Sequence, residues 1–333
     1  MTVWPIPEGV KALLDVLRRV GHAAHPVGGC VRDLLLGRTP GDFDVCTSAR
    51  PEQVMALFPR TVPTGVKHGT VTVLTGDGPV EVTTFRREEG YADGRHPDAV
   101  AFDAGLNEDL ARRDFTVNAM ALGAEGEVLD PFGGRADLER RLIRCVGDPD
   151  RRFAEDALRM FRALRFAAQL GFEIEEDTLA AIRRNARRAE NLSGERVKAE
   201  LEKILLSPRP ERAGEALELG LLAHLWPERT CPDLAGLGDL PPEPIPRWRG
   251  FCRITGFPIT ALPVERALRR GVLHPEEEAL RRLALSGGEL AALGFVGPAI
   301  GAAQRRLAAH VLAHPEDNTK EKLLALAERY REG

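Results

Sequence analysis

The residue pattern changes once along the chain, near position 150, and this change limits the fold more than any other feature. Before it, runs rich in β-branched residues, such as Val71–Leu74 and Val80–Phe85, alternate with amphipathic stretches. After Phe153 the strand signals nearly vanish, and amphipathic helical segments follow one another. The pattern therefore predicts an α+β fold, in which a mixed β-sheet is followed by helices alone.

Residue signals within each part give approximate boundaries. In the first part we expect helices at 10–20, 31–36 and 51–58, and strands at 24–27, 42–46, 71–74 and 80–85. In the second part we expect helices at 153–170, 176–190, 194–206 and 211–223, and again from 264 onward. A proline-rich run at 241–246 predicts a linker or a long loop. The predicted division is a mixed domain over 1–145, a helical segment over 146–206 and a second over 207–333.

Composition excludes several classes of protein. The 333 residues are enough for two to four domains. The chain has no apolar run of about 18 residues and no charged-then-apolar leader at Met1, so we expect a cytoplasmic protein with no membrane partner. Its five cysteines are odd in number and never form a CxxC pair, which argues against both a disulfide framework and a zinc site.

A glycine turn followed by two aspartates is the first candidate site. Gly28 and Gly29 lie between a predicted strand and a predicted helix, where bare amides and Arg32 could approach a phosphate, although such a pair is more often only a tight turn. Asp42 and Asp44 follow in the next strand, and the strand period of two places both carboxylates on one face. Such a pair needs a counter-charge, which Mg²⁺ with substrate phosphates supplies. This spacing favours phosphoryl-transfer chemistry.

Glu81 is the candidate third carboxylate of that site. It lies between two valines in a predicted strand that could neighbour the aspartates. An ordinary exposed strand residue would have the same pattern, so the two interpretations stay open.

Six stretches of the chain resemble the class II tRNA nucleotidyltransferase and poly(A) polymerase family, whose catalytic domains are of the polymerase β type. The tail, LSGGELAALGFVGPAIG followed by NTKEKLL, resembles the C-terminal region of bacterial CCA-adding members. Between about 207 and 282 little matches. The six stretches are HPVGGCVRDLLLGRTPGDFDVCTSA, PTGVKHGTVTV, EVTTFRREEGYADGRHP, RRDFTVNAMAL, EDALRMFRALRFAAQLGF and SGERVKAELEKIL, which span 25–206.

The resemblance implies a fold and a set of roles. It implies a nucleotidyltransferase head over 1–145, a neck over 146–206, and a helical body and tail. Asp42 and Asp44 would bind two Mg²⁺ ions, or Mn²⁺, while Gly29 and Arg32 would hold the triphosphate of CTP or ATP. Arg113 and Asp114 match the family motif at the sugar and phosphate side of the nucleotide, and the adjacent Arg112 could meet an oxyanion or be solvated.

The segment from Glu155 to Arg165 is the second candidate site. Apolar residues at helical spacing predict a buried face formed by Ala157, Phe161, Leu164 and Ala168. Asp156, Arg159 and Arg162 recur every three residues on the opposite side, as in an ordinary surface helix with one ion pair. The resemblance implies instead that Asp156 and Arg159 read the base of the incoming nucleotide. It also places Arg162 and Arg165 near the nucleotide, with Glu155 orienting the others.

The formal net charge is −4, so the chain as a whole does not attract nucleic acid. Any nucleic-acid partner must therefore bind a local basic patch. Residues 140–200 carry a net charge of +3. Within them, four arginines at helical spacing could follow an RNA backbone or be a solvated face. These are Arg183, Arg184, Arg187 and Arg188. The resemblance implies that the protein recognises the shape of the tRNA acceptor arm and elbow. The sequence does not indicate the oligomeric state.

The implied reaction is the addition of CCA to the 3′ end of tRNA, and rival reactions exist within the family. Addition of CC alone is disfavoured, because those members lack a loop that here extends from Arg87 to Leu110. The stretch 87–97 is polar with two glycines, as expected of a mobile loop that helps the switch from C to A. The PTGVKHGTVTV stretch argues against a poly(A) polymerase, and addition of the final A alone stays open. An intact DxD argues against a non-catalytic RNA-binding relative.

Overall fold

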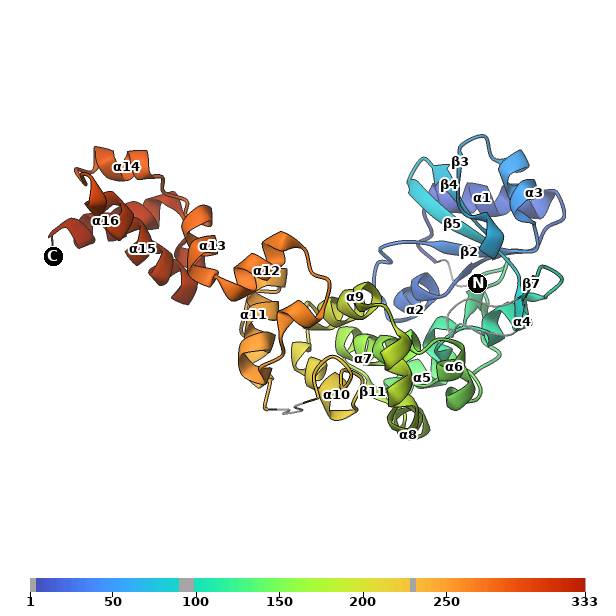
Figure 1. The fold of residues 1–333 in the computed structure, drawn as a ribbon. Helices are drawn as coiled ribbons and strands as arrows, with labels where there is room; N and C mark the ends of the chain where they lie inside the picture. Colours follow the sequence, from blue (N-terminus) through green and yellow to red (C-terminus); the bar gives the residue numbers. More distant parts are fainter. Residues whose placement is uncertain (1–3, 90–98, 228–231, 333) are drawn as a thin grey trace. The chain divides into compact units, whose positions relative to one another are not determined.

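The computed structural model describes residues 4–89, 99–227 and 232–332 (Figure 1). The chain forms two compact units, 1–231 and 232–333. The sequence-derived boundaries at 145 and 206 both fall inside the first unit and stay predictions. Residues 90–97 of the expected mobile loop lie outside the described residues.

The first unit begins with a seven-stranded sheet in the order β3-β4-β5-β2-β1-β8-β9. β2 pairs with β5 in parallel, while the other neighbours are antiparallel, so the sheet is mixed as predicted. The strands are β1 (Ala24–Val27), β2 (Asp44–Thr47), β3 (Thr61–Gly65), β4 (Thr70–Thr75), β5 (Gly78–Thr84), β8 (Ala121–Leu122) and β9 (Val128–Leu129). Two short pairs lie outside it: β6 (Arg87–Glu89) with β7 (Ala99–Ala101), and β10 (Leu142–Ile143) with β11 (Glu173–Ile174).

Short helices flank the sheet. α1 (Glu8–Arg19) buries Val10, Leu13, Leu14 and Leu17, which recur at helical spacing, and it contacts β1 and β4. The expected helices at 31–36 and 51–58 are confirmed, with small shifts, as α2 (Gly29–Leu35) and α3 (Pro51–Leu57). α4 (Leu106–Ala111) and α5 (Gly134–Arg140) complete this part.

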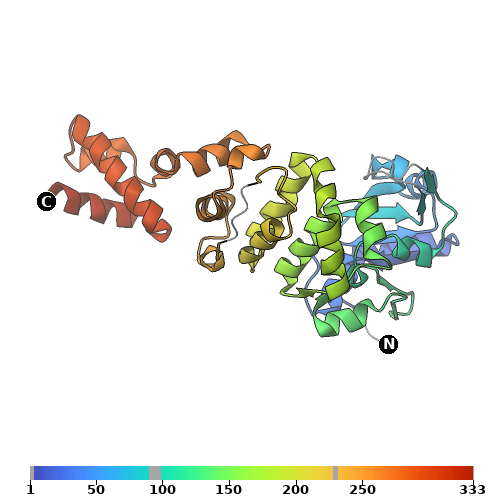
Figure 2. The ribbon, with the colours of Figure 1, turned by 60° about the horizontal axis from the view of Figure 1, so that its bottom comes forward.

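Apart from the short strand β11, helices form the rest of the first unit, and Figures 1 and 2 show them as a layer beside the sheet. They are α6 (Pro149–Glu155), α7 (Leu158–Leu170), α8 (Glu176–Asn185), α9 (Gly194–Leu205) and α10 (Ala213–Glu218). The predicted face of Ala157, Phe161, Leu164 and Ala168 is buried, as expected.

Three helix predictions in this part need correction. The helix expected at 153–170 is two helices, because Asp156 is extended and its Oδ1 accepts a hydrogen bond from the amide of Leu158 at 3.0 Å. The helix expected at 176–190 ends at Asn185 and continues as a 3₁₀ turn, Ala186–Asn191. Only Ala213–Glu218 of the segment 211–223 is α-helical.

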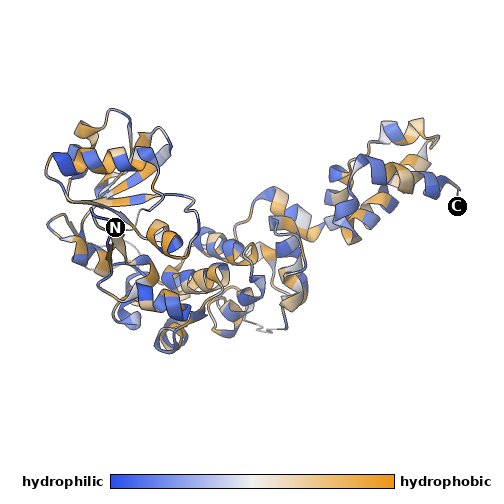
Figure 3. Cartoon of the chain, turned by 180° about the vertical axis from the view of Figure 1, so that it is seen from behind, coloured by the Kyte–Doolittle hydropathy of each residue, from blue (hydrophilic) through white to orange (hydrophobic). Residues whose placement is uncertain are grey.

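The second unit contains α11 (Pro244–Thr255), α12 (Arg266–Leu273), α13 (Pro275–Arg282), α14 (Gly287–Ala292), α15 (Pro298–Ala313) and α16 (Lys320–Glu332). Polar and apolar residues alternate around these helices (Figure 3), and Leu285, Leu290, Leu307 and Leu323 meet in a buried cluster. The linker expected at 241–246 is wrong from Pro244 onward, because Pro244 opens α11 and prolines fit the first turn of a helix. No helix in the described parts of the chain is long and apolar enough to cross a membrane.

Candidate active site

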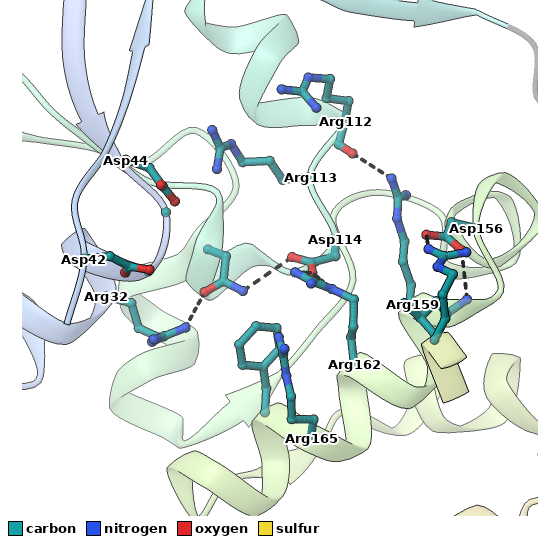
Figure 4. Close-up of a pocket in the computed structure, with 16 residues that line it drawn as sticks. Arg32, Asp42, Asp44, Arg112, Arg113, Asp114, Asp156, Arg159, Arg162 and Arg165 are labelled. Atoms are coloured by element: carbon teal, nitrogen blue, oxygen red, sulfur yellow. Dashed lines mark hydrogen bonds and ion pairs between the residues drawn. The ribbon is translucent and has the colours of Figure 1, made fainter. Parts of the chain in front are cut away.

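A cavity of about 530 Å³ in the first unit brings together most of the residues singled out from the sequence (Figure 4). One wall comes from the turn after β1 and the start of β2, another from the segment after α4, and a third from α7 and α9. It is lined by Gly28, Gly29, Arg32, Asp42, Asp44, Arg112, Arg113, Asp114, Asn118, Asp156, Leu158, Arg159, Arg162, Arg165, Phe166 and Arg196.

The glycine turn places backbone at the cavity wall. Gly28 has φ 82°, which favours glycine, and a Cβ there would come within 3.0 Å of the Arg113 guanidinium. Gly29 begins α2, so the first amides of that helix have no partner within the helix. Arg32, one turn later, donates from Nη1 to Oδ1 of Asn118 at 2.8 Å. Amides and a guanidinium therefore border the same space, as a phosphate site requires.

Three carboxylates gather at the start of β2. Asp42 precedes the strand rather than lying in it, which corrects the expected strand 42–46, but both aspartates turn toward the cavity (Figure 4). Glu81 is exposed on β5 directly beside Asp44 in the parallel register, and it does not line the cavity. Burial, with the charges of Asp42 and Glu81, raises the pKa of Asp44 from 3.8 to about 6. Arg113 offsets only part of this negative charge, so the site suits an oxygen-preferring cation.

Asp109 holds the two arginines of the RRDF stretch. Its carboxylate is fully buried and accepts from Nη2 of Arg112 at 2.8 Å and from Nη2 of Arg113 at 3.2 Å. Arg112 is therefore paired rather than merely solvated, and its carbonyl accepts from Nη2 of Arg159 at 3.1 Å. Both guanidiniums keep their place at the cavity because a buried anion orients them.

Asp114 connects the sheet side of the cavity to α7. It is buried, and it accepts from Nε of Arg162 at 2.7 Å and, more loosely, from Nδ2 of Asn118 at 3.4 Å. Although burial alone would raise its pKa, Arg162 and Arg159 lower the pKa of Asp114 to about 2. Since Asn118 also holds Arg32, a chain of contacts runs from the glycine turn to α7.

Asp156 and Arg159 lie at the junction of α6 and α7. Asp156 accepts from Nη2 of Arg196, on α9, at 2.8 Å, in addition to the Leu158 amide. Arg159 donates from Nη1 to Oε2 of Glu155 at 2.8 Å. Glu155 is buried, and its ion pair with Arg159 fixes one end of that guanidinium, while the role that the resemblance implied for Glu155 stays a prediction. The expected continuous row on one helix is wrong, because Asp156 precedes α7; the two side chains nevertheless line one cavity.

Phe166 forms an aromatic wall among arginines. The guanidinium carbon of Arg165 lies 4.2 Å from its ring centroid, and those of Arg32 and Arg162 lie at 5.4 Å. Arg165 also pairs with the buried Glu200 at 3.3 Å. Asn118, Phe166 and Arg196 also line the cavity, and Asp109 holds two of its arginines, although none of these four residues was predicted from the sequence.

The four arginines of 183–188 lie away from this cavity. Arg184 pairs with Asp150 at 2.7 Å, and Arg188 donates to Asn185. The side chain of Arg187 is 90% exposed, with Glu190 only at 3.7 Å. Their role in RNA binding stays a prediction.

Known protein families and solved structures are similar to this chain in both sequence and fold. The model of the poly(A) polymerase head domain matches residues 24–144, and the model described as the probable RNA and SrmB binding site of polymerase A matches 171–231. The structure is similar to the crystal structure of the Bacillus stearothermophilus CCA-adding enzyme in complex with CTP, with a TM-score of 0.70, 32% identity and 97% of both chains covered. The chain belongs to the tRNA nucleotidyltransferase and poly(A) polymerase family.

Two relatives of known sequence have a higher sequence identity to this chain than that structure has, but over a shorter stretch. The CCA-adding enzyme of Anoxybacillus flavithermus is 47% identical over 251 residues, which are 74% of this chain and 63% of that enzyme. The CCA-adding enzyme of Geobacillus kaustophilus is 51% identical over 66% of this chain and 54% of its own length. The chain thus spans a little over half the length of these relatives. Nucleotidyltransferases of this family are generally metal-dependent.

Proposed function

We propose that this protein adds CCA to the 3′ end of tRNA, using CTP and ATP and no nucleic-acid template. The observation that carries the proposal is one cavity bordered by an acidic strand end, phosphate-binding groups and a charged pair on the neighbouring helices. The 3′-hydroxyl of the tRNA attacks the α-phosphate of the nucleotide, and pyrophosphate leaves. We place the reaction in the cytoplasm, where its substrates are.

The acidic end of the cavity is the proposed metal site. Asp42 and Asp44 would hold two Mg²⁺ ions, or Mn²⁺, with Glu81 beside them as a third carboxylate. Such ions stabilise the attacking and leaving oxygens when bound. The raised pKa of Asp44 supports this assignment, because a bound cation would stabilise the charge that burial and the neighbouring carboxylates disfavour.

The triphosphate would lie along the arginine-lined wall. The amide of Gly29 and the guanidiniums of Arg32 and Arg113 are donors for its oxygens, whereas the Gly28 amide donates to the carbonyl of Met120 at 3.1 Å. Asp109 and Asn118 keep the two guanidiniums in place, so that little side-chain freedom is lost on binding. Asp114 would act mainly by orienting Arg162.

Base selection is assigned to Asp156 and Arg159. A carboxylate accepts from the exocyclic amines of cytosine and adenine, and a guanidinium donates to their ring acceptors. Asp156 accepts from Arg196 and the Leu158 amide, and a carboxylate has about four acceptor positions, so it keeps capacity for a base. Arg159 donates to Glu155 and to the carbonyls of Arg112 and Arg152, and a guanidinium has five donors, so it also keeps capacity. Guanine and uracil carry a carbonyl in place of the amine, which would leave these groups unpaired.

The partner is proposed to be tRNA, held through its acceptor arm and elbow by the helices beyond the cavity. The exposed Arg187 and its neighbours Arg183, Arg184 and Arg188 are candidates for contacts with the RNA backbone. The solved Thermotoga maritima CCA-adding enzyme complexed with tRNA is only 21% identical, and it supports the fold alone.

The end product distinguishes this proposal from addition of the final A alone. We expect the purified protein to extend three forms of tRNA, ending before CCA, after the first C and after CC, each to full CCA. The measurement is gel separation of the products with CTP alone, ATP alone and both. An enzyme that extends only tRNA ending in CC, and leaves CTP unused, would be an A-adding enzyme.

A further inference from the structure

Two histidines and two carboxylates meet at the end of α15, in the second unit. His310 is in the last turn of the helix, and His314 caps it four residues later, on the same face. Their ring centroids are 4.8 Å apart. Nothing in the proposed reaction uses these side chains.

The chain then turns back on the helix. Pro315 opens a 3₁₀ turn, Pro315–Asp317, that carries both carboxylates toward the histidines. Oδ2 of Asp317 lies 2.8 Å from Nε2 of His310, and Oε1 of Glu316 lies 3.7 Å from Nδ1 of His314. Among the described residues, His314, Glu316 and Asp317 are the one group of three such side chains whose ligand atoms all lie within 4.8 Å of one another.

We propose that His310, His314, Glu316 and Asp317 bind a divalent transition-metal ion, with Zn²⁺ as the best fit. A tetrahedral zinc site with bonds of about 2.0–2.1 Å separates its ligand atoms by about 3.4 Å. The 3.7 Å between Glu316 and His314 is close to that value, whereas the 2.8 Å between Asp317 and His310 is a hydrogen-bond distance that would lengthen when both groups bind the ion. Imidazole and carboxylate ligands suit Zn²⁺ rather than Mg²⁺, so this site differs in chemistry from the acidic strand end.

The surroundings of Asp317 support a ligand role. Nζ of Lys322, in α16, lies 2.7 Å from Oδ1, while Oδ2 faces His310. The side chains of His310 and Asp317 are only 24% and 25% exposed. A bound ion would thus join the end of α15 to the turn Pro315–Asp317, and Lys322, in α16, would orient one ligand.

Zinc titration of the full chain tests the site. The protein is first stripped with a chelator, and the calorimetric titration with Zn²⁺ is made in excess Mg²⁺. We expect one Zn²⁺ per chain with a Kd of about 1 μM or below, and binding at least about tenfold weaker in His310→Ala and in His314→Ala. His274→Ala, which removes an exposed histidine of the same unit, is the matched control and should bind as the original protein does.

A second readout identifies the ligands. Co²⁺ in place of Zn²⁺ should give the visible absorption of a tetrahedral site, and His310→Ala should lose it. Asp44→Asn should keep zinc binding, because the acidic strand end is a different site. If the original protein binds zinc no better than the two histidine variants, or if Asp44→Asn removes binding, the cluster is only a hydrogen-bonded surface network.

Discussion

Asp44→Asn should abolish nucleotide addition and yet stabilise the protein in the absence of metal. Asparagine keeps the shape of the side chain but removes a charge that the proposed reaction needs for its metal ions. We expect addition to fall by at least about 10³-fold, since a lost metal ligand removes several kcal/mol of transition-state stabilisation. Binding of tRNA should survive, because the helices beyond the cavity provide it.

The stability effect follows from the pKa of Asp44, which is raised from 3.8 to about 6. Below about pH 4 the carboxyl is protonated in both the folded and the unfolded chain, so Asp44→Asn should change little. Between about pH 4 and 6 the unfolded chain has lost this proton while the folded chain still holds it, so the original protein loses stability relative to the variant. Above about pH 6 the difference should be complete, at about 1–3 kcal/mol in favour of the variant.

Urea unfolding with and without metal measures this effect. At about pH 8 without metal the variant should have the higher midpoint, and at about pH 4 the two midpoints should coincide. Millimolar Mg²⁺ should raise the midpoint of the original protein and leave that of the variant unchanged. An original protein that is already the more stable at high pH without metal would contradict the proposed cation site.

Arg159→Ala should relax the choice of base. Glu155 and the carbonyl of Arg112 hold this guanidinium at the cavity, so its loss removes a fixed charged donor. A charge-assisted hydrogen bond contributes about 1.5–3 kcal/mol, and we therefore expect preference for CTP and ATP over UTP and GTP to fall by about 10–100-fold.

The measurement is kcat/KM for each nucleotide under single addition. Glu155→Gln should shift the preference in the same direction but less, because it loosens Arg159 without removing it. Arg140→Ala, which removes an exposed arginine at the end of α5 outside the cavity, is the matched control. Unchanged discrimination in Arg159→Ala would exclude a protein template at this position.

Part of this site can be predicted from sequence because its signals are local. Gly28 and Gly29 follow a predicted strand, so the glycine pair alone indicates a turn. Asp42 and Asp44 are two residues apart, a spacing that places both carboxylates on one side of an extended chain. Asn118 and Arg196 were missed, because each acts through a partner brought close only by the fold. Asp109 was missed although its partners Arg112 and Arg113 are only three and four residues away, a local spacing that could have identified it. Arg196 meets Asp156 across 40 residues of chain, and Asn118 meets Arg32 across 86.

The break between α6 and α7 also could not be predicted from the sequence, although it lies within a single short segment. The apolar spacing of Ala157, Phe161 and Leu164 continues across the break, so periodicity predicts one helix. Asp156 ends it by accepting a hydrogen bond from the amide of Leu158, a local competition that periodicity does not record. The break places Asp156 at the cavity, where Arg196 can reach it.

The central claim is that one cavity selects and joins nucleotides without a nucleic-acid template, and sequencing the added tail tests it most directly. Transfer RNA that ends before CCA is incubated with the protein, Mg²⁺ and equal concentrations of all four nucleotides, and each 3′ end is then read. We expect the tail C-C-A followed by no further addition. Tails that contain U or G, or runs of A, would contradict the claim.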